Sequence, residues 1–382
     1  MSTHYDIIFT GGGAAALSLA YRGMQSGIFA NKQLLIIEPS AKTSNDKTWC
    51  FWEEQAGPFE DILFKRWAHM KVYGNNGREI VLQPGSFEYK MIRSIDFYEH
   101  TLNYLKQQTN ITFLQASVDE INANKVGKAV AHAEGVGYSA DTIFNSIFKK
   151  PHLQSDQNYF IQHFLGEIIQ LPANNHIDPE AIHLMDFRTS QEHGTAFFYV
   201  LPLHNNQVLV EYTLFTKQVL DRTAYKTAIK AFIQEHLMVS DYEVLEEEYG
   251  EIPMTDFPFQ RFDGRVVNIG SAGGDTRGSS GYTFSNIQRT VSAILQAYRK
   301  TGQPVFQKPT ISKKHQLYDK TLLRVLNNNQ YQGHEMFTDL FTKAPAHKVF
   351  RFLDGTSTLI EDTAIMTSLK SKHFIFPFIN SI

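Results

Sequence analysis

The sequence predicts an α/β protein: a Rossmann-like dinucleotide-binding domain, a β-rich substrate domain and a helical C-terminal region. Two glycine-rich turns carry this prediction, and each follows a short apolar strand. One opens the chain at residues 5–16, and the other lies near the opposite end at residues 265–282. A binding domain assembled from discontinuous segments around a β-rich insertion explains this order.

The first turn has the spacing G-x-G-x-x-A, formed by Gly11, Gly13 and Ala16. Glycines let backbone N–H groups approach phosphate oxygens, and the positive end of the following helix favours their negative charge. Ala16 still permits close helix–strand packing. The next strand, residues 33–38, ends in Glu38, an acid placed to hold a ribose hydroxyl. Together these features predict a bound dinucleotide, and the alternative is an unliganded turn in a parallel sheet.

The remaining elements follow from periodicity and turn residues. Helices are expected over residues 14–28, 96–107 with Asp96 as N-cap, 218–237 and 283–300, and most of 284–372. Strands are expected at 111–114, 119–130 as a pair, 142–145 and 265–270, with β-rich segments at 60–95, 159–171 and 195–214 and a hairpin turn at 204–206. The predicted domains are therefore 1–60 with 95–150 and 255–300, then 61–94 with 151–254, and finally the helical region 301–382.

Composition limits the classes of partner and cellular location that we expect for this chain. The chain has 382 residues, 42% of them hydrophobic, and a net charge of −3, so we expect no nucleic-acid partner. A single cysteine, Cys50, suits a reducing compartment and is expected to be a buried thiol. No apolar run approaches the roughly 18 residues that span a bilayer. The first strand begins almost at once, so no signal peptide is expected, and no metal site is predicted.

The second glycine cluster, residues 270–282, contains Gly270, Gly273, Gly274 and Gly281 followed by Tyr282. Its donors suit the flavin end of a long dinucleotide, so the two turns together predict FAD, held in a fold of the glutathione-reductase and aromatic-hydroxylase type. Ser271 stands where many FAD proteins carry a ribityl-binding acid. The predicted cofactor-binding residues are Gly11, Gly13, Ala16, Glu38, Val118, Gly270, Gly273, Gly274, Gly281 and Tyr282.

Several blocks of the chain resemble the FAD-dependent lycopene cyclases of carotenoid synthesis. They lie at residues 45–52, 164–167, 185–188, 198–202, 210–213, 249–254 and 280–282. The most specific are Met185–Arg188, the Glu-x-Thr strand at Glu211 and the Gly-x-Ile-Pro-Met block at Gly250. The chain departs from that family in two places: Tyr212 replaces a second acid after Glu211, and Arg277 and Gly278 stand in the late loop.

The resemblance implies a non-redox cyclisation of the linear end groups of lycopene to β rings. Glu211 is the implied proton donor, since a carboxyl in an apolar tunnel stays protonated, and Asp186 is a secondary candidate. From the residues alone, Glu211 could instead be a surface acid, and Asp186 could form an ion pair with Arg188. Glu167 and Glu251 are weaker candidates. Trp49 and Trp52 line the substrate path or belong to the core.

The implied cofactor is FAD in its reduced form, with NAD(P)H as reductant. The implied partners are lycopene or a related carotene and a membrane surface, so the expected location is cytoplasmic with peripheral membrane association. The apolar tail at 373–379 could dip into a membrane or pack on the body. Two other functions remain open: an FAD-dependent monooxygenase or polyprenyl reductase, and a non-catalytic isoprenoid-binding flavoprotein.

Overall fold

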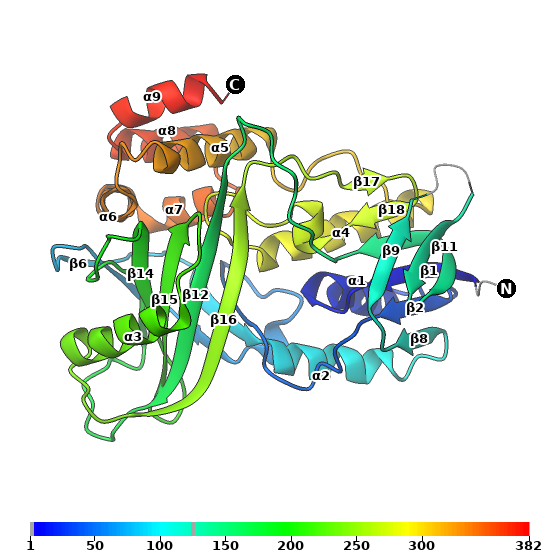
Figure 1. The fold of residues 1–382 in the computed structure, drawn as a ribbon, viewed down its shortest axis with the longest axis horizontal. Coiled ribbons are helices and arrows are strands. Elements are labelled where there is room, and N and C mark those ends of the chain that lie inside the picture. The colour runs from blue at the N-terminus through cyan, green and yellow to red at the C-terminus, as the bar shows by residue number, and fades with distance from the viewer. Residues whose placement is uncertain (1–3, 124–126, 382) are drawn as a thin grey trace.

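Two large β-sheets lie side by side in the computed structural model, which describes residues 4–123 and 127–381 (Figure 1). Helices α1, α2 and α4 accompany the first sheet. Helices α5 to α9 gather beside the second sheet, at the end of the molecule where the C-terminus lies. This arrangement confirms the expected fold class, with its Rossmann-like sheet, β-rich second sheet and helical C-terminal region.

The first sheet has the strand order β17-β18-β11-β1-β2-β8. These strands span Phe262–Asp263, Val266–Asn268, Val136–Asn145, His4–Thr10, Leu34–Ile37 and Ile111–Leu114. Strands β9 (Val118–Asn122) and β10 (Ala129–Ala133) extend it through β11, and residues 124–126 of the predicted strand pair lie outside the described residues. β1 runs parallel to both β2 and β11, so the first glycine turn lies at the carboxyl edge, near the middle of the sheet.

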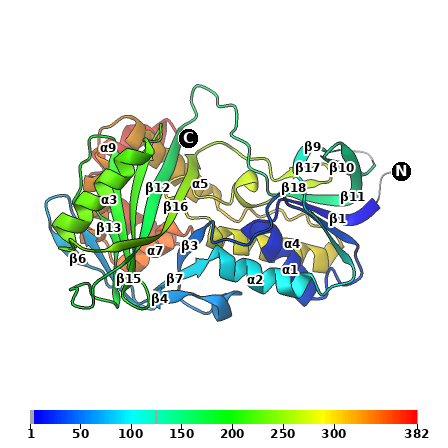
Figure 2. The same ribbon diagram turned by 60° about the horizontal axis from the view of Figure 1, so that its bottom comes forward.

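Three helices cover one face of this sheet: α1 (Ala14–Gln25), α2 (Ser94–Leu105) and α4 (Phe284–Thr301) (Figure 2). The Arg22 guanidinium of α1 binds Gln288 and Ser292 of α4, at 3.0 and 2.8 Å. The expected N-cap of α2 is wrong, because Arg93 occupies the cap position. Asp96 instead lies in the first turn, where a negative charge is favoured, and binds Arg93 at 2.7 Å.

The second sheet has the order β16-β12-β15-β14-β13-β5-β6. Its strands span Glu243–Thr255, Tyr159–Gln170, Gln207–Thr216, Thr195–Pro202, Ala181–Asp186, His69–Tyr73 and Glu79–Val81. The predicted hairpin between β14 and β15 is confirmed, and Asn205 and Asn206 adopt φ values of 57° and 58°, as a tight hairpin turn requires. Helix α3 (Arg222–His236) covers one face, with Asp221 as its N-cap.

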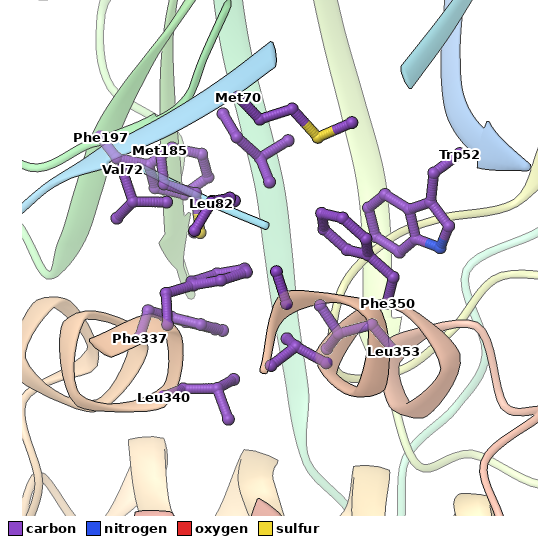
Figure 3. Close-up of a cluster of buried hydrophobic side chains, with 14 of the residues drawn as sticks. Trp52, Met70, Val72, Leu82, Met185, Phe197, Phe337, Leu340, Phe350 and Leu353 are labelled. Atoms are coloured by element: carbon purple, nitrogen blue, oxygen red, sulfur yellow. The ribbon is translucent and has the colours of Figure 1, made fainter. Parts of the chain in front are cut away.

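The opposite face of the second sheet carries the larger core (Figure 3). Met70, Val72 and Phe197 from the sheet meet Phe337 and Phe350 from the C-terminal helices there. Those helices are α5 (Lys313–Asn327), α6 (Gly333–Lys343), α7 (Ala346–Leu353), α8 (Leu359–Ser368) and α9 (Lys372–Ile379). A small sheet of β3 (Thr48–Glu53), β7 (Glu88–Arg93) and β4 (Lys65–Trp67) links the two halves, because Trp52 belongs to this core and Phe51 to the other.

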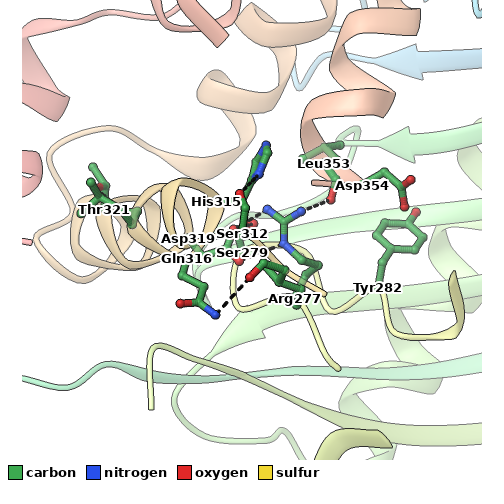
Figure 4. Close-up of polar contacts among 12 residues, drawn as sticks. Arg277, Ser279, Tyr282, Ser312, His315, Gln316, Asp319, Thr321, Leu353 and Asp354 are labelled. Carbon is green, nitrogen blue, oxygen red and sulfur yellow. Dashed lines mark hydrogen bonds and ion pairs between the residues drawn. The ribbon is translucent and has the colours of Figure 1, made fainter. Parts of the chain in front are cut away.

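A buried ion pair ties the second glycine cluster to the C-terminal helices (Figure 4). The Arg277 guanidinium donates to both oxygens of Asp319, at 2.9 and 2.7 Å, and to the Leu353 carbonyl at 2.7 Å. Ser279 donates to Asp319 as well, at 2.6 Å. A Cβ at Gly278 would lie 2.7 Å from the Thr255 carbonyl oxygen, so the loop needs glycine there. Arg277 and Gly278 therefore fix the loop in place.

Replacing Arg277 with Met should lower the free energy of unfolding by about 3–5 kcal/mol, because Asp319 would remain buried without its counter-charge. Denaturant titration followed by far-UV circular dichroism measures this loss. The exposed Arg299, replaced in the same way, is the control and should change little. A loss below about 1 kcal/mol for Arg277→Met would contradict a structural role for the pair.

Candidate functional site

A cavity of about 690 Å³ lies between the two large sheets. Its walls come from both glycine-rich turns, from β3 and from the facing strands of the second sheet. Segments far apart in the sequence therefore meet at one site. Residues from both halves of the molecule contribute, so the site depends on how the two sheets are joined.

One end of the cavity is formed by the first glycine turn. Gly11 and Gly13 line it, together with Glu38, Lys42 and Val118. Gly11 has a φ of +91°, and a Cβ there would lie 2.4 Å from Ser146 Oγ, so only glycine fits. A Cβ at Gly13 would meet nothing within 4 Å, because this glycine opens onto the cavity. This end suits a diphosphate, which needs close approach to backbone.

Glu38 and Ala16 also contribute to this end. A Glu38 carboxylate oxygen accepts the Gly12 N–H at 2.6 Å, and the other lies 3.3 Å from the Lys42 ammonium. The carboxylate is thus held at the cavity wall, where a ribose hydroxyl would reach it. Ala16 is only 1% exposed and packs in the core of the first sheet, so it serves helix–strand packing.

The other end of the cavity is formed by the second glycine cluster. Gly270, Ser280, Gly281 and Tyr282 line it, with Gln162 opposite. Within the described part of the chain, Gln162 Oε1 and Ser280 Oγ are buried without a hydrogen-bond partner. A Cβ at Gly281 would lie 2.1 Å from Gln162 Oε1, so glycine makes room for that amide. Two unpaired polar atoms beside a glycine cradle fit the polar edge of a flavin.

Gly273 and Gly274 were expected to bind the cofactor, and the structure places them behind the loop. They line a separate hollow, which they share with Arg261 and Lys313. A Cβ at Gly273 would lie 2.1 Å from the Asn268 carbonyl oxygen, and Gly274 has a φ of +77°. Both positions therefore need glycine for the turn itself.

Asp275 organises the same loop, and sequence reasoning missed it. The side chain is fully buried, and it accepts hydrogen bonds from the Gly270 N–H at 2.8 Å, Arg261 at 2.6 Å and Thr290 at 2.6 Å. Its carboxylate thus fixes the backbone of Gly270 from behind. Asp275 lies five residues beyond Gly270, and its position in the loop gave no sign of burial.

Glu211 faces the cavity from the middle of the second sheet. Its strand, β15, lies between β12 and β14, so the alternative of an edge-strand surface acid does not apply. Thr213 Oγ1 donates to Glu211 Oε1 at 2.7 Å. Burial raises the pKa of Glu211 to about 8, and the charge of Glu248 adds to the rise. At neutral pH the carboxyl is therefore predominantly protonated.

Aromatic side chains line the cavity near this carboxyl, and Tyr199 is its cross-strand neighbour. The hydroxyl of Tyr282 lies 3.3 Å from that of Tyr199 and 3.5 Å from that of Tyr89, and the Tyr282 ring lies 4.3 Å from the Trp52 ring. Burial raises the pKa of Tyr282 to about 12. Burial also raises the pKa of the neighbouring Cys50 thiol, so these groups are uncharged at neutral pH.

Glu248 is a second acid that faces the cavity, and sequence reasoning missed it. It projects from β16, and its Oε1 accepts the Thr48 N–H at 3.0 Å. Burial raises its pKa. The start of β16 is exposed and rich in glutamate, so this strand was not predicted from the sequence. Side chains alternate between the two faces of a strand, and this rule would have placed residues 248, 250, 252 and 254 on one face.

Asp186 lies away from this cavity. Its fully buried carboxylate accepts hydrogen bonds from Arg188 at 2.6 and 2.9 Å and from His183 at 3.0 Å. Burial opposes ionisation, but these partners outweigh it and hold the pKa of Asp186 below its usual range. Both oxygens are engaged, so the group is suited to structure and poorly suited to proton donation.

The weaker candidates are also dispersed. Glu167, which follows Gly166 on β12, is buried on the face of the sheet that packs against α3. Glu251 is exposed at the cavity margin, where the Tyr249 hydroxyl donates to it at 2.8 Å. Trp49 lines the cavity and stacks on Phe284.

The raised pKa of Glu211 makes stability depend on pH. The unfolded carboxyl loses its proton near pH 4, whereas the folded one keeps it to about pH 8. Relative to Glu211→Gln, wild-type protein should therefore lose stability by up to about 1.4 kcal/mol per pH unit between pH 5 and 8, and the difference should level off above that. Urea titrations of both proteins at matched flavin content measure this. Parallel pH profiles would contradict the assignment.

Solved structures with similar folds cover nearly the whole chain. A flavoprotein/dehydrogenase from Cytophaga hutchinsonii aligns with a TM-score of 0.64, at 12% identity, over 96% of this chain and 98% of its own. A geranylgeranyl bacteriochlorophyll reductase-like protein from Thermoplasma acidophilum aligns with a TM-score of 0.61, at 12% identity, over 100% and 96%. At these identities the likeness establishes the fold alone.

Sequence comparison identifies the family. A lycopene beta-cyclase of Pseudescherichia vulneris is 24% identical over 383 aligned positions, which cover 95% of this chain and 93% of the relative. The match to a lycopene beta-cyclase of Pantoea ananas is 23% identical over 264 positions, covering 67% of this chain and 64% of that relative. The model of the lycopene cyclase protein family matches residues 6–381. The chain therefore belongs to the lycopene cyclase family.

Proposed function

We propose that this protein closes the linear end groups of lycopene into β rings, in a reaction without net electron transfer. The observation that carries the proposal is the position of Glu211, whose carboxyl lies near aromatic side chains in a cavity that continues to both glycine-rich turns, where burial raises its pKa to about 8. Membership of the family and the resemblance of the Glu-x-Thr strand support the same reaction.

In this proposal Glu211 donates its proton to the terminal double bond of the substrate, at carbon 2 of the end group. A tertiary cation forms at carbon 1, the neighbouring double bond attacks it, and a proton then leaves the new ring. The Thr213 hydroxyl orients the carboxyl at 2.7 Å. The faces of Tyr199 and Tyr282, which line the cavity, carry negative electrostatic potential that stabilises a cation.

The cavity also fits FAD. Gly11, Gly13, Glu38 and Val118 would hold the adenine–diphosphate half, and Gly270 with Ser280–Tyr282 would hold the flavin end. Bound in its reduced, anionic form, with NAD(P)H as the reductant, FAD would supply negative charge to this cavity.

An apolar substrate has to leave a bilayer, and helices α8 and α9 offer a surface for contact with one. Leu359, Ile360, Ile375, Phe376 and Ile379 are between 58% and 83% exposed. Phe374 on the other side of α9 packs against the large core, so one side of the tail packs on the body and the other is exposed. Among the described residues, no helix is long and apolar enough to cross a membrane. We therefore propose peripheral binding through this surface.

Cells that accumulate lycopene test the reaction. Expression of the wild-type protein should yield ringed carotenes, and Glu211→Gln should abolish them while flavin content is retained. Glu167→Gln, which changes a buried acid on the other face of the neighbouring strand, should leave cyclisation intact. Pigment analysis by liquid chromatography gives the readout.

Two results would overturn this function. Lycopene left unchanged by flavin-loaded wild-type protein with reductant present would exclude cyclisation. Consumption of one NAD(P)H for each product formed would instead indicate a monooxygenase or a polyprenyl reductase.

Membrane binding has its own test. The double variant Ile360→Ser, Phe376→Ser should bind phospholipid vesicles several-fold more weakly than wild-type protein in a co-sedimentation assay, because two exposed apolar side chains are lost. The control double variant Val81→Ser, Val136→Ser removes exposed apolar side chains elsewhere and should bind as wild type does. Equal binding by all three proteins would exclude this surface.

A further inference from the structure

We propose that Glu248 is a second catalytic residue, which accepts the proton released on ring closure and returns it to Glu211. The inference rests on the proposed cyclisation and adds the base that the reaction needs. Strand β16 supplies a second carboxyl to the cavity that Glu211 faces, from another part of the sheet.

Strand register places the two acids in one row. Glu211 on β15 pairs with Gly166 on β12, and Gly166 pairs in turn with Glu248 on β16. Residues directly opposite in neighbouring strands point to the same face, so both carboxyls project into the cavity. Their Cα atoms are two strand spacings apart, or about 10 Å. A pair of long side chains can approach each other across that gap.

The residue between them is glycine, and this leaves space above the central strand. A Cβ at Gly166 would lie 3.4 and 3.5 Å from Cβ and Cγ of Glu211, and 3.0 Å from Leu209 Cδ1. The Glu211 side chain therefore leans over Gly166, on the side where β16 and Glu248 lie. Any larger residue at 166 would crowd Glu211 and fill part of the gap between the acids.

The electrostatics of the pair favour a single shared proton. Burial raises the pKa of both carboxyls, and the charge of Glu248 raises that of Glu211 further. Hydrogen bonds from Thr48 and the charge of Lys47 pull the pKa of Glu248 back. Like charges in one dry cavity resist joint ionisation, so the proton rests on Glu211 and Glu248 is the carboxylate. The other titratable groups that face the pair are Asp46, Lys47, Cys50, Tyr89, Tyr199 and Tyr282.

This assignment closes the proton balance. Glu211 gives one proton to the double bond, and the cation closes by forming one carbon–carbon bond. Glu248 then takes the proton that leaves the ring carbon, and the electrons of that C–H bond become the ring double bond. Glu211 is now ionised and Glu248 protonated, so transfer of one proton from Glu248 to Glu211 restores the start. No oxidant or reductant is consumed.

The test compares Glu248→Gln with wild type in a pH series of the cyclisation rate. Glutamine keeps the hydrogen bond from Thr48 but cannot take a proton, so the rate should fall by about 10²-fold or more. Loss of the negative neighbour should also lower the pKa of Glu211, and the high-pH limb of the profile should move to lower pH. Glu248→Asp, which keeps a carboxylate, should recover part of the rate. The exposed Glu246→Gln, on the same strand, is the control.

A measurement without substrate separates this inference from the proposed function. Infrared difference spectra, recorded against pH, report the protonated carboxyl bands that Glu211→Gln removes. Glu248→Gln should shift the titration of the remaining band to lower pH. Wild-type protein that makes no rings would overturn both proposals. Normal cyclisation by Glu248→Gln, with an unchanged pH profile and an unshifted band, would overturn this role alone.

Discussion

The removal of a carboxyl group from water is the constraint on which the rest of this site depends. A carboxylate in an apolar cavity is costly, so Glu211 keeps its proton unless a partner compensates it. The surroundings are arranged accordingly: a hydroxyl donor from Thr213, aromatic faces, and a thiol whose own pKa is raised. Asp186 shows the opposite solution in the same sheet, because Arg188 and His183 compensate its charge.

The cavity lies where the two sheets meet, because both glycine-rich turns of the first sheet face the middle strands of the second. The first glycine turn lies where a parallel sheet presents its carboxyl edge, as in other dinucleotide-binding folds. The second glycine cluster leaves the same edge of this sheet, because it follows β18, which runs parallel to β11. Asp275 holds it from behind, and the Arg277–Asp319 pair anchors it to the C-terminal helices. The geometry of this end of the cavity therefore depends on packing far from the strand that precedes the loop.

Local signals predicted the first turn, Glu38 and the fold class, because glycine spacing and strand order depend on short stretches of chain. The role of Glu211 came from family resemblance, since its strand alone looked like an exposed edge. Glu248 and Asp275 escaped prediction for a shared reason: their burial is created by other segments, β12 and β3 for one and α4 for the other. Gly273 and Gly274 resembled ligand-binding glycines, but the loop needs them for its own backbone path.

The ion pair between Arg277 and Asp319 has a consequence for how this chain can be shortened. Helices α5 and α7 supply Asp319 and the Leu353 carbonyl, so both partners of the guanidinium come from the last part of the chain. Truncation before residue 319 would leave a buried cation inside the loop that borders the cavity. The terminal helices cannot be removed as an independent appendage, because the second glycine cluster depends on them for the partners of Arg277.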